Sequence, residues 1–505
     1  MPSSLPTPAR RPLLLAATAA AVIAVAPLMP SALAPFAAAP AIADDDGDDG
    51  GGGRGGGRGG RGGRGGPSPS GTEGARTGPA TSRLPIDDAI RRLMKRPDDR
   101  AGKRQVRRQE QRRPPAARAA PLPPPPPEFV VAVTSADDLG RITAAGYTVV
   151  EQAPVALIGG EVARLRAPAG TSLEAARAAV AAAAPTAVLD LNTLYRPDEP
   201  EADAAPPAVD GPCIGEACAA FEQVGWMAPP RACAVTPVIG MIDTGVNPDL
   251  EALAGRDLTV VPMAGSERPP ADALHGTAVA ALFLGDPSSR SPGLLPQAKL
   301  IAVEAFHRDG AGAAADAFSL VRAIDRLAGE VEVMSLSLSG PANALLERAV
   351  TATLARNVAI VAAAGNEGPR AEPRFPAAYA GVVAVTAVDG RGRVYRNAGQ
   401  GAHVAFAAPG VQLTVARSVR GVRQRSGTSY AVPFVAAAVA AARAELPDPA
   451  AVPVADTVAA LAAGAVDLGD PGRDPVFGHG LVQAPGPCAA PALQGVALEA
   501  DAAMR

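Results

Sequence analysis

Residues 425–433 have the sequence RSGTSYAVP, and an alanine-rich apolar segment, Phe434 to Ala442, follows them. The apolar segment predicts a buried helix with Ser429 near its start. At a helix start, backbone N–H groups without intrahelical partners favour negative charge. This setting suits a serine whose attack on a carbonyl creates an oxyanion. It equally suits a serine that merely caps the helix, so the stretch alone leaves both interpretations open.

Three further segments place a polar residue at the end of a predicted strand or helix. Asp243 ends the apolar run VIGMID, which is typical of a buried parallel strand. His275 opens the small-residue helix predicted from HGTAVAA, and Asn366 follows the apolar run IVAAAG. The four polar residues therefore occur in the order Asp, His, Asn, Ser. In α/β proteins, chemistry is placed at such ends of strands and helices.

These motifs resemble those of the subtilisin-like serine proteases, in which Asp, His and Ser occur in this order along the chain. The resemblance covers residues 235–485. It implies an α/β catalytic domain, a subtilisin-like parallel sheet with helices on both faces and right-handed crossovers. The strands expected at the centre of that sheet are Val238–Ile242, Leu300–Ala305, Val333–Leu338, Ala359–Ala363 and Val382–Val388.

The resemblance also implies a role for each polar residue. Ser429 would attack the peptide carbonyl, His275 would take its proton and later pass it to the leaving amine, and Asp243 would orient the imidazole. Asn366 would donate its amide to the oxyanion, beside the backbone N–H of Ser429. The implied activity is that of a serine endopeptidase. No metal or other cofactor is expected; relatives commonly bind calcium, but no acidic loop here is distinctive enough to name a calcium site.

In the resembling family a substrate binds as an added β-strand. The residues implied on its two sides are Ser337, Leu338, Ser339 and Gly340 on one, and Gly310 and Gly312 on the other. Family members often have glycine where Ser339 stands, so a narrower primary pocket is expected. Arg374 stands where the base of that pocket is commonly small. It either favours acidic or polar side chains in the substrate or points to solvent.

Three other histidines lack the helix-opening His-Gly-Thr context, so we expect them to be structural or at the surface: His307, His403 and His479. Asp249 lies close to Asp243 in the sequence, but it belongs to an Asn-Pro-Asp run that predicts a turn. Tyr430 stands where relatives often carry methionine. This departure removes no catalytic group, so it does not argue against activity.

The chain of 505 residues is too long for a single average domain, and its 48% hydrophobic content is ample for a large core. Its formal net charge of −3 gives no general attraction to nucleic acid or membranes, and no nucleic acid is expected as a partner. Arg10 and Arg11 precede the apolar run Leu13 to Leu28, which predicts a signal peptide over residues 1–43. The chain is therefore expected to be exported, secreted or periplasmic, without a stable membrane span after signal cleavage. An uncleaved anchor is the alternative.

Residues 44–127 are rich in Gly, Arg and Pro, and we expect them to be a disordered, flexible spacer. Arginines in a glycine tract also occur in segments that bind RNA or tether proteins, which is the alternative interpretation. Residues 128–197 predict the element order βαββαβ, which is ferredoxin-like. Their second helix is expected to extend from an N-cap at Thr171 to Ala184, with Glu174 completing a capping box.

The position of residues 128–197, directly before a subtilisin-like domain, resembles that of the family's inhibitory propeptide. An unrelated small α+β domain is the alternative. The segment Leu191 to Arg196 is expected to lie across the active site as an extended strand, on the same edges as substrate. Self-processing is predicted between about Arg196 and Val235, at an exposed segment. The implied partners are protein or peptide substrates and the chain's own propeptide in cis.

Residues 198–234 are expected to be a linker with cysteines, and residues 486–505 a C-terminal tail. The chain has four cysteines: Cys213, Cys218, Cys233 and Cys488. An even number in an exported chain predicts two disulfides in any of three pairings, with free thiols as the alternative. Pairing the first two would close a small local loop, whereas pairing the last two would tie together the ends of the protease domain.

The function that these patterns predict is that of an exported, self-processed serine endopeptidase. The alternative is a non-catalytic binding or scaffold protein built on a subtilisin-like fold. The presence of all four polar site residues favours the enzyme.

Overall fold

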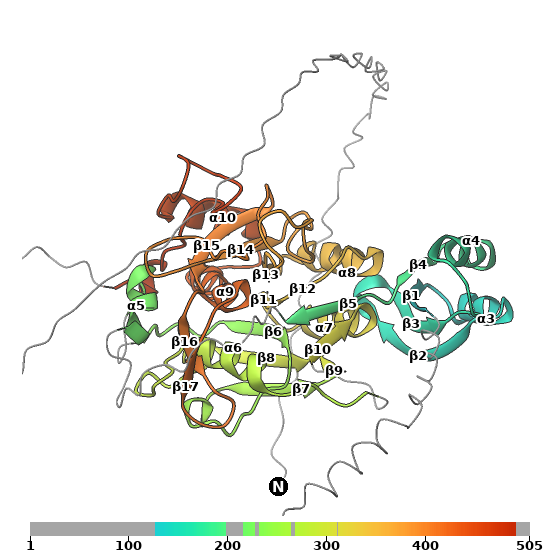
Figure 1. Ribbon diagram of the computed structural model, residues 1–505, viewed down its shortest axis with the longest axis horizontal. Coiled ribbons are helices and arrows are strands. Elements are labelled where there is room, and N and C mark those ends of the chain that lie inside the picture. Colours follow the sequence, from blue (N-terminus) through green and yellow to red (C-terminus); the bar gives the residue numbers. More distant parts are fainter. Residues whose placement is uncertain (1–126, 198–215, 228–231, 264–267, 311, 491–505) are drawn as a thin grey trace, which may run out of the picture. The chain divides into compact units, whose positions relative to one another are not determined.

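The computed structural model describes residues 127–197, 216–227, 232–263, 268–310 and 312–490 (Figure 1). The predicted signal peptide, nearly all of the Gly/Arg-rich spacer, Cys213 and most of the C-terminal tail lie outside the described residues. So does much of the predicted processing region. The predictions that concern these segments therefore stay predictions.

The larger domain is built on a seven-stranded sheet in which every neighbouring pair of strands is parallel. In sheet order the strands are β15 (Val404–Pro409), β14 (Val383–Val388), β13 (Ala359–Ala363), β11 (Val333–Leu336), β6 (Val238–Asp243), β8 (Lys299–Glu304) and β7 (Leu258–Pro262). Successive side chains of a strand point to opposite faces, so they enter two separate cores. Met241 and Val361 lie in one core, whereas Ile242 and Ile360 lie in the other. Burial on both faces explains why these strands are continuous apolar runs.

Helices cover both faces of this sheet (Figure 1). On one face, α6 (Leu274–Leu284) and α9 (Thr428–Ala444) contact each other; on the other, α7 (Ala317–Leu327) packs beside α8 (Ala344–Leu354). α10 (Val454–Gly464) packs against α9, which is buried along nearly its whole length. A helix enclosed in this way needs apolar residues all round, which accounts for its alanine-rich sequence.

The five central strands predicted from the sequence are all present, and they confirm the predicted α/β architecture. The edge strands β7 and β15 were not among the predicted strands. None of the residues of β7 is fully buried, and four of the six residues of β15 are alanine or proline, so neither is a long apolar run of the kind that marks the central strands. The interpretation of Ser429 as a capping serine is wrong. Gly427 is the N-cap of α9, and Ser429 is the second residue of the helix.

Residues 128–197 form what we call the N-terminal module. It consists of β1 (Glu128–Val133), α3 (Ala136–Ala144), β2 (Thr148–Val155), β3 (Gly160–Arg166), α4 (Leu173–Ala183), β4 (Val188–Leu191) and a final strand, β5 (Leu194–Pro197). The first four strands make an antiparallel sheet in the order β2-β3-β1-β4, which is the predicted ferredoxin-like arrangement. The side chains of Phe129, Ile142 and Leu165 are fully buried in a core of its own.

The predicted cap of α4 is wrong by one residue. Ser172, and not Thr171, is the N-cap, and its hydroxyl accepts a hydrogen bond from Ala175 N at 3.1 Å. The hydroxyl of Thr171 instead donates to Pro168 O at 2.7 Å and closes the preceding turn. Glu174 is therefore the second helical residue, one position too early for a capping box.

The last strand of the module leaves its sheet and joins strands of the larger domain. It belongs to a four-stranded sheet in the order β12-β5-β10-β9, with β12 at Leu338–Ser339, β10 at Gly312–Asp316 and β9 at His307–Asp309 (Figure 1). β5 is antiparallel to both of its neighbours. The remaining elements are α5 (Glu216–Gln223), the hairpin of β16 (Leu413–Ala416) and β17 (Val422–Arg425), and short 3₁₀ turns at Ala156–Ile158, Glu251–Leu253 and Gly486–Cys488.

A disulfide joins Cys233 to Cys488, which connects the first residues of the larger domain with its last described ones. Cys218 is also disulfide-bonded, and none of the described cysteines is free. The prediction that disulfides form is thus confirmed for these residues. Within the part of the chain that the structure describes, no helix combines the length and the apolar character needed to cross a membrane.

Candidate active site

Asp243 and His275 lie together at the carboxyl end of the central sheet. Asp243 is the last residue of β6, and its Oδ1 lies 2.7 Å from Nδ1 of His275, the second residue of α6. Both side chains are only 1% exposed. Asp243 Oδ1 also accepts a hydrogen bond from Thr244 N at 2.7 Å. The carboxylate is thereby held in one orientation, and it faces one particular nitrogen of the imidazole.

The two residues that follow His275 hold α6 against the loop after Asp243. Gly276 N donates to the hydroxyl of Thr244 at 2.9 Å, and Asn247 N donates to the hydroxyl of Thr277 at 2.8 Å. A Cβ at position 276 would lie 2.7 Å from Gly245 O, closer than any side chain tolerates. The backbone approach therefore requires glycine here, which gives the His-Gly-Thr motif its structural reason.

Ser429 lies in the first turn of α9 and is fully buried. Its carbonyl oxygen accepts a hydrogen bond of 2.9 Å from Oγ of Ser337, at the end of the sheet. The next residue, Tyr430, packs its ring against the imidazole of His275, with 5.3 Å between the ring centroids. These contacts fix the start of α9 beside His275. The helix N-terminus adds a positive partial charge at the serine.

Asn366 is oriented by Thr428, the residue before Ser429. The amide oxygen of Asn366 accepts hydrogen bonds from the backbone N–H and from the hydroxyl of Thr428, both at 3.1 Å. Two donors on one oxygen fix the plane of the amide, so its NH₂ group is turned away from Thr428. This role of Thr428 was not predicted from the sequence. Its only signal was its place directly before the serine.

β5 occupies the groove between β12 and β10, where a substrate strand is expected to bind. Arg196 is paired with Ser339 and Pro197 with Leu338, while Tyr195 lies opposite Ala315. Of the residues predicted on this side, Leu338 and Ser339 pair with the extended strand and Gly340 lies under the ring of Tyr195. On the other side the pairing falls on Ala315 and Asp316 of β10, rather than on the predicted glycines. Gly312 begins β10, and Gly310, with a positive φ of 59°, forms the turn before it.

Tyr195 is the most deeply held residue of β5. Its side chain is fully buried, and its hydroxyl donates to Pro341 O at 2.8 Å. Burial raises the pKa of this phenol well above its usual value. The ring lies so close to Gly340 that a Cβ at that position would stand 2.7 Å from Cε1. This contact could not be predicted from the sequence, because its two partners are far apart in the chain.

Two residues of the module cap helices of the larger domain. The carboxylate of Asp190 accepts a hydrogen bond from Ala344 N at 2.9 Å, at the start of α8. The amide oxygen of Asn192 accepts one from Phe318 N at 3.1 Å, at the start of α7. Unpaired backbone donors gather at both helix starts, and an anionic side chain there is stabilised by the helix dipole.

Ion pairs extend this contact between the module and the larger domain. Arg268 pairs with Asp316 at 2.6 Å and with Glu128 of the module at 3.0 Å. Arg164, only 5% exposed, lies 3.7 Å from the same Asp316. The burial of His307 lowers its pKa, and the charge of Arg268 lowers it further. The expected structural role of His307 is consistent with this setting.

Arg374 lies beside the segment that carries Asn366. A Cβ at Gly365 would be 2.8 Å from Cγ of Arg374, so the arginine stem covers this glycine. Its Nε forms an ion pair with Glu367 at 3.0 Å. The next residue, Phe375, exchanges two backbone hydrogen bonds of 2.9 Å with Gly340. Arg374 is therefore neither remote from the groove nor simply extended into solvent.

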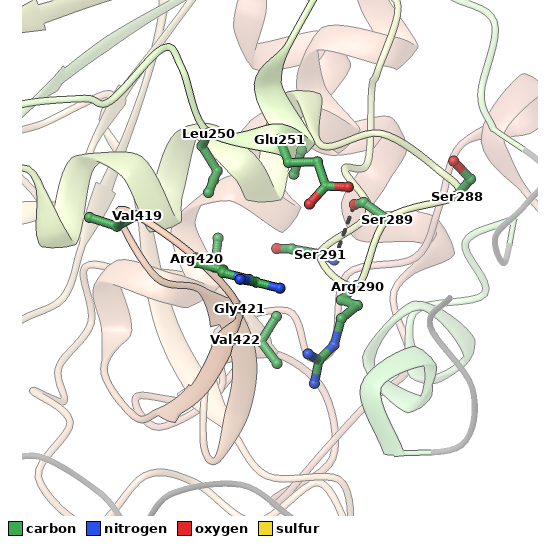
Figure 2. Close-up of a pocket in the computed structure, with 12 residues that line it drawn as sticks. Leu250, Glu251, Ser288, Ser289, Arg290, Ser291, Val419, Arg420, Gly421 and Val422 are labelled. Carbon is green, nitrogen blue, oxygen red and sulfur yellow. Dashed lines mark hydrogen bonds between the residues drawn. The ribbon is translucent and has the colours of Figure 1, made fainter. Parts of the chain in front are cut away.

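A separate cavity of about 280 Å³ lies under the β16–β17 hairpin. Figure 2 shows Glu251, Arg290 and Arg420 around it, and Val419 at its rim is 80% exposed. None of the four polar residues of the candidate active site lines this cavity. Among the described residues, no group of three or more His, Cys, Asp or Glu side chains is placed to hold a metal ion.

The part of the chain that carries these four residues matches known proteins. A family model described as the subtilase family matches residues 235–480. The chain is 32% identical over 248 residues to the minor extracellular protease Epr of Bacillus subtilis (strain 168), which covers 48% of this chain and 37% of Epr. It is 32% identical over 214 residues to subtilisin BL of Lederbergia lenta, which covers 41% of this chain and 77% of subtilisin BL.

The chain spans half or less of the length of some of these relatives. The chain spans 37% of Epr and 50% of the thermophilic serine proteinase of Bacillus sp. (strain AK1). Among solved structures, fervidolysin from Fervidobacterium pennivorans, a keratinolytic enzyme related to subtilisin, has a TM-score of 0.59 at 21% identity. That match covers 71% of this chain and 60% of fervidolysin, and it concerns the fold alone. Taken with the family model and the extensive match to subtilisin BL, these findings show that the chain belongs to the subtilase family.

Proposed function

We propose that this chain is an exported serine endopeptidase that hydrolyses peptide bonds with Asp243, His275 and Ser429. The observation that carries the proposal is the buried 2.7 Å contact between Asp243 Oδ1 and His275 Nδ1, next to the helix start that holds Ser429. A serine hydroxyl is a poor nucleophile at neutral pH without an adjacent base. The base must also keep one tautomer, which the carboxylate at Nδ1 provides by leaving Nε2 to act.

In the proposed reaction, Ser429 Oγ attacks the carbonyl carbon while His275 Nε2 accepts the hydroxyl proton. The C–N bond then breaks, and the imidazolium gives that proton to the leaving amine. An ester on Ser429 remains. A water molecule then attacks this ester while His275 accepts a proton from the water. The imidazolium returns the proton to Oγ when the C–O bond to Ser429 breaks. Each step uses side chains of this chain, and none calls for a metal or a cofactor.

The negative charge of each tetrahedral intermediate would be stabilised by Asn366 and by the backbone N–H of Ser429. The support for this role is the pair of hydrogen bonds from Thr428 that fixes the amide of Asn366 in advance. A donor that is already oriented needs no reorganisation as the charge develops. The helix dipole of α9 favours the same charge.

We further propose that the N-terminal module is an inhibitory propeptide and that the chain is a self-processed zymogen. The support is the placement of β5 between β12 and β10, where it uses the backbone groups that an added substrate strand would need. The helix caps from Asp190 and Asn192 and the ion pairs of Arg268 hold the module over this groove. Cleavage after β5 would then free the groove.

Export is supported by the signal-like N-terminus and by the disulfides, which persist in oxidising compartments. The relative Epr is itself described as an extracellular protease. The substrates would be proteins or peptides bound in extended form. A secreted or a periplasmic location fits these features.

A fluorophosphonate probe tests the catalytic proposal against the alternative of a non-catalytic scaffold. We expect the probe to label Ser429 in the purified protein, and to leave Ser429→Ala unlabelled. The masses of the two proteins, expressed alike, test self-processing: wild type should lose its N-terminal part, and Ser429→Ala should keep it. An unlabelled wild-type protein without peptidase activity would favour the scaffold.

A further inference from the structure

We propose that Arg374 makes the enzyme prefer an acidic side chain in the residue immediately before the cleaved bond. This inference rests on the proposed function, because it concerns which peptide bonds the same site selects. It goes beyond the fold and the catalytic residues, which do not by themselves define a substrate.

The register of β5 identifies the position next to the nucleophile. Arg196 lies opposite Ser339, and Pro197 lies opposite Leu338. In an antiparallel pair, the next residue of a strand bound in this register faces Ser337. The hydroxyl of Ser337 donates to the carbonyl oxygen of Ser429. The position that follows the one held by Pro197 is therefore the one beside Ser429.

Arg374 lies against the segment that leads to the proposed oxyanion donor. Its stem covers Gly365, which directly precedes Asn366, the proposed oxyanion donor. Its neighbour Phe375 is hydrogen-bonded to Gly340, in continuation of the edge that binds β5. Arg374 thus lies between the oxyanion donor and the strand edge. Under this proposal, a side chain that leaves the bound strand next to Ser429 reaches this guanidinium.

The ion pair with Glu367 does not satisfy the guanidinium. Glu367 contacts Nε, while a guanidinium has five N–H donors in a planar fork that suits a carboxylate. The side chain of Glu367 is 42% exposed and that of Arg374 is 28% exposed. Exposed ion pairs of this kind contribute little, so Glu367 can turn to water when a substrate carboxylate arrives.

The alternative is a preference for a basic substrate side chain, which Glu367 would bind. Two observations favour the acidic one. The cation is the less exposed member of the pair, so a lysine entering the groove would meet a like charge. The residue that follows Pro197 in the sequence is Asp198, which lies outside the described residues. In the sequence, an acid therefore directly follows the strand that occupies the groove.

Four fluorogenic peptides test the proposal: acetyl-Tyr-Arg-Pro-X-aminomethylcoumarin with X as Asp, Asn, Ala or Lys. Their first three residues copy Tyr195 to Pro197, so they bind in the register of β5. The wild-type enzyme, its active sites titrated with a fluorophosphonate, should show a kcat/KM for Asp roughly tenfold to a hundredfold above that for its isostere Asn, the range of a charge-assisted hydrogen bond. The Ala peptide measures the proposed activity without this contact.

Arg374→Gln should bring the Asp-to-Asn ratio close to one, and this ratio is the readout because any loss of activity that all four peptides share cancels in it. Arg374→Lys should retain part of the ratio, and Glu367→Gln should keep or raise it. Arg370→Gln, an exposed arginine in the same loop, is the matched control and should keep the full ratio.

A wild-type enzyme that cleaves Ala and Asn peptides but gains nothing from Asp overturns the proposal for Arg374. So does an unchanged ratio in Arg374→Gln, or a Lys peptide that is the best of the four. These outcomes leave the proposed function standing. Failure to cleave any peptide, together with an unlabelled Ser429, would instead refute the proposed function itself.

Discussion

The aromatic ring of Tyr195 fills the space above Gly340, where any larger residue would have a Cβ. The contact joins the last strand of the N-terminal module to the edge of the groove. Because the tyrosine is fully buried and its hydroxyl is bound to Pro341 O, it anchors β5 more firmly than the exposed Arg196 beside it can. The fit at this one glycine therefore bears directly on how well the module blocks the groove.

Gly340→Ala should loosen β5 without unfolding the domain. The added methyl group collides with the ring of Tyr195, and overpacking of this kind costs about 1–3 kcal/mol. In a Ser429→Ala background, hydrogen exchange of the backbone amides of residues 194–196 should accelerate roughly tenfold or more. Gly329→Ala, where a Cβ meets no atom within 4 Å, is the control and should leave the exchange unchanged. Equal exchange in both variants would contradict the anchoring role.

Substitution of the proposed catalytic residues should have graded effects on turnover. Ser429→Ala or His275→Ala should lower kcat by about 10⁶, because either change abolishes the activated nucleophile. Asp243→Asn should cost about 10⁴, since the imidazole then keeps the wrong tautomer. Steady-state kinetics on a neutral peptide would measure both. Wild-type rates in purified Ser429→Ala would show that another group performs the chemistry.

Loss of Asn366, or of a hydrogen bond that orients its amide, should lower kcat while KM stays nearly constant. Asn366→Ala should reduce kcat roughly 10²–10³-fold, the loss known for an oxyanion-hole asparagine in a subtilisin. Thr428→Val removes one of the two hydrogen bonds to the amide oxygen and should have a smaller effect of the same kind. Thr428→Ser keeps the hydroxyl and should retain near wild-type kcat. An increase in KM alone, at unchanged kcat, would speak against this role.

The disulfide between Cys233 and Cys488 should contribute substantially to stability. It closes a loop of 255 residues, and removal of such a bond costs roughly 2–5 kcal/mol. Urea unfolding of a Ser429→Ala protein, with and without the double change Cys233→Ala and Cys488→Ala, would measure this cost and avoid self-digestion. The chosen replacement is alanine because both cysteines are fully buried. Coincident unfolding curves would show that the disulfide does not contribute to the free energy of unfolding.

Acidification should destabilise the folded protein in part through His307. Its pKa is lowered from 6.5 first by burial and then by the charge of Arg268, with a further small effect of Arg164, while Asp316 and Asp309 oppose the shift. The folded protein therefore binds this proton less readily than the unfolded chain does. The contribution of neutral His307 to the free energy of unfolding is fully present above 6.5, the pKa of the residue in the unfolded chain. It is lost as the pH falls from there through the lower pKa of the folded protein.

The test compares the melting temperatures of Ser429→Ala and of Ser429→Ala with His307→Gln between about pH 8 and about pH 5. The melting temperature of the variant with glutamine should fall less on acidification than that of Ser429→Ala alone. Parallel curves would mean that His307 does not titrate in this range.

Some features of the fold were predictable because they depend on residues that are close in the chain. The strands at 238–242 and 359–363 are continuous apolar runs, as burial on both faces of a parallel sheet requires, and each ends at a polar residue that reaches the site. The exact start of a helix was harder to predict where two adjacent residues can both serve as its cap. Ser172 and Thr171 both suit a helix cap, and only the turn closed by Thr171 decides between them.

The sequence by itself determined the order of Asp243, His275, Asn366 and Ser429, and it placed each at the end of an apolar element. Only the tertiary structure decided that Thr428 orients Asn366, that Asp190 and Asn192 cap helices of the other domain, and that Tyr195 rests on Gly340. The physical reason is the range of the interactions. Periodicity and helix starts follow from adjacent residues, whereas these contacts join groups that are 62 or more residues apart and form only after the domains have packed.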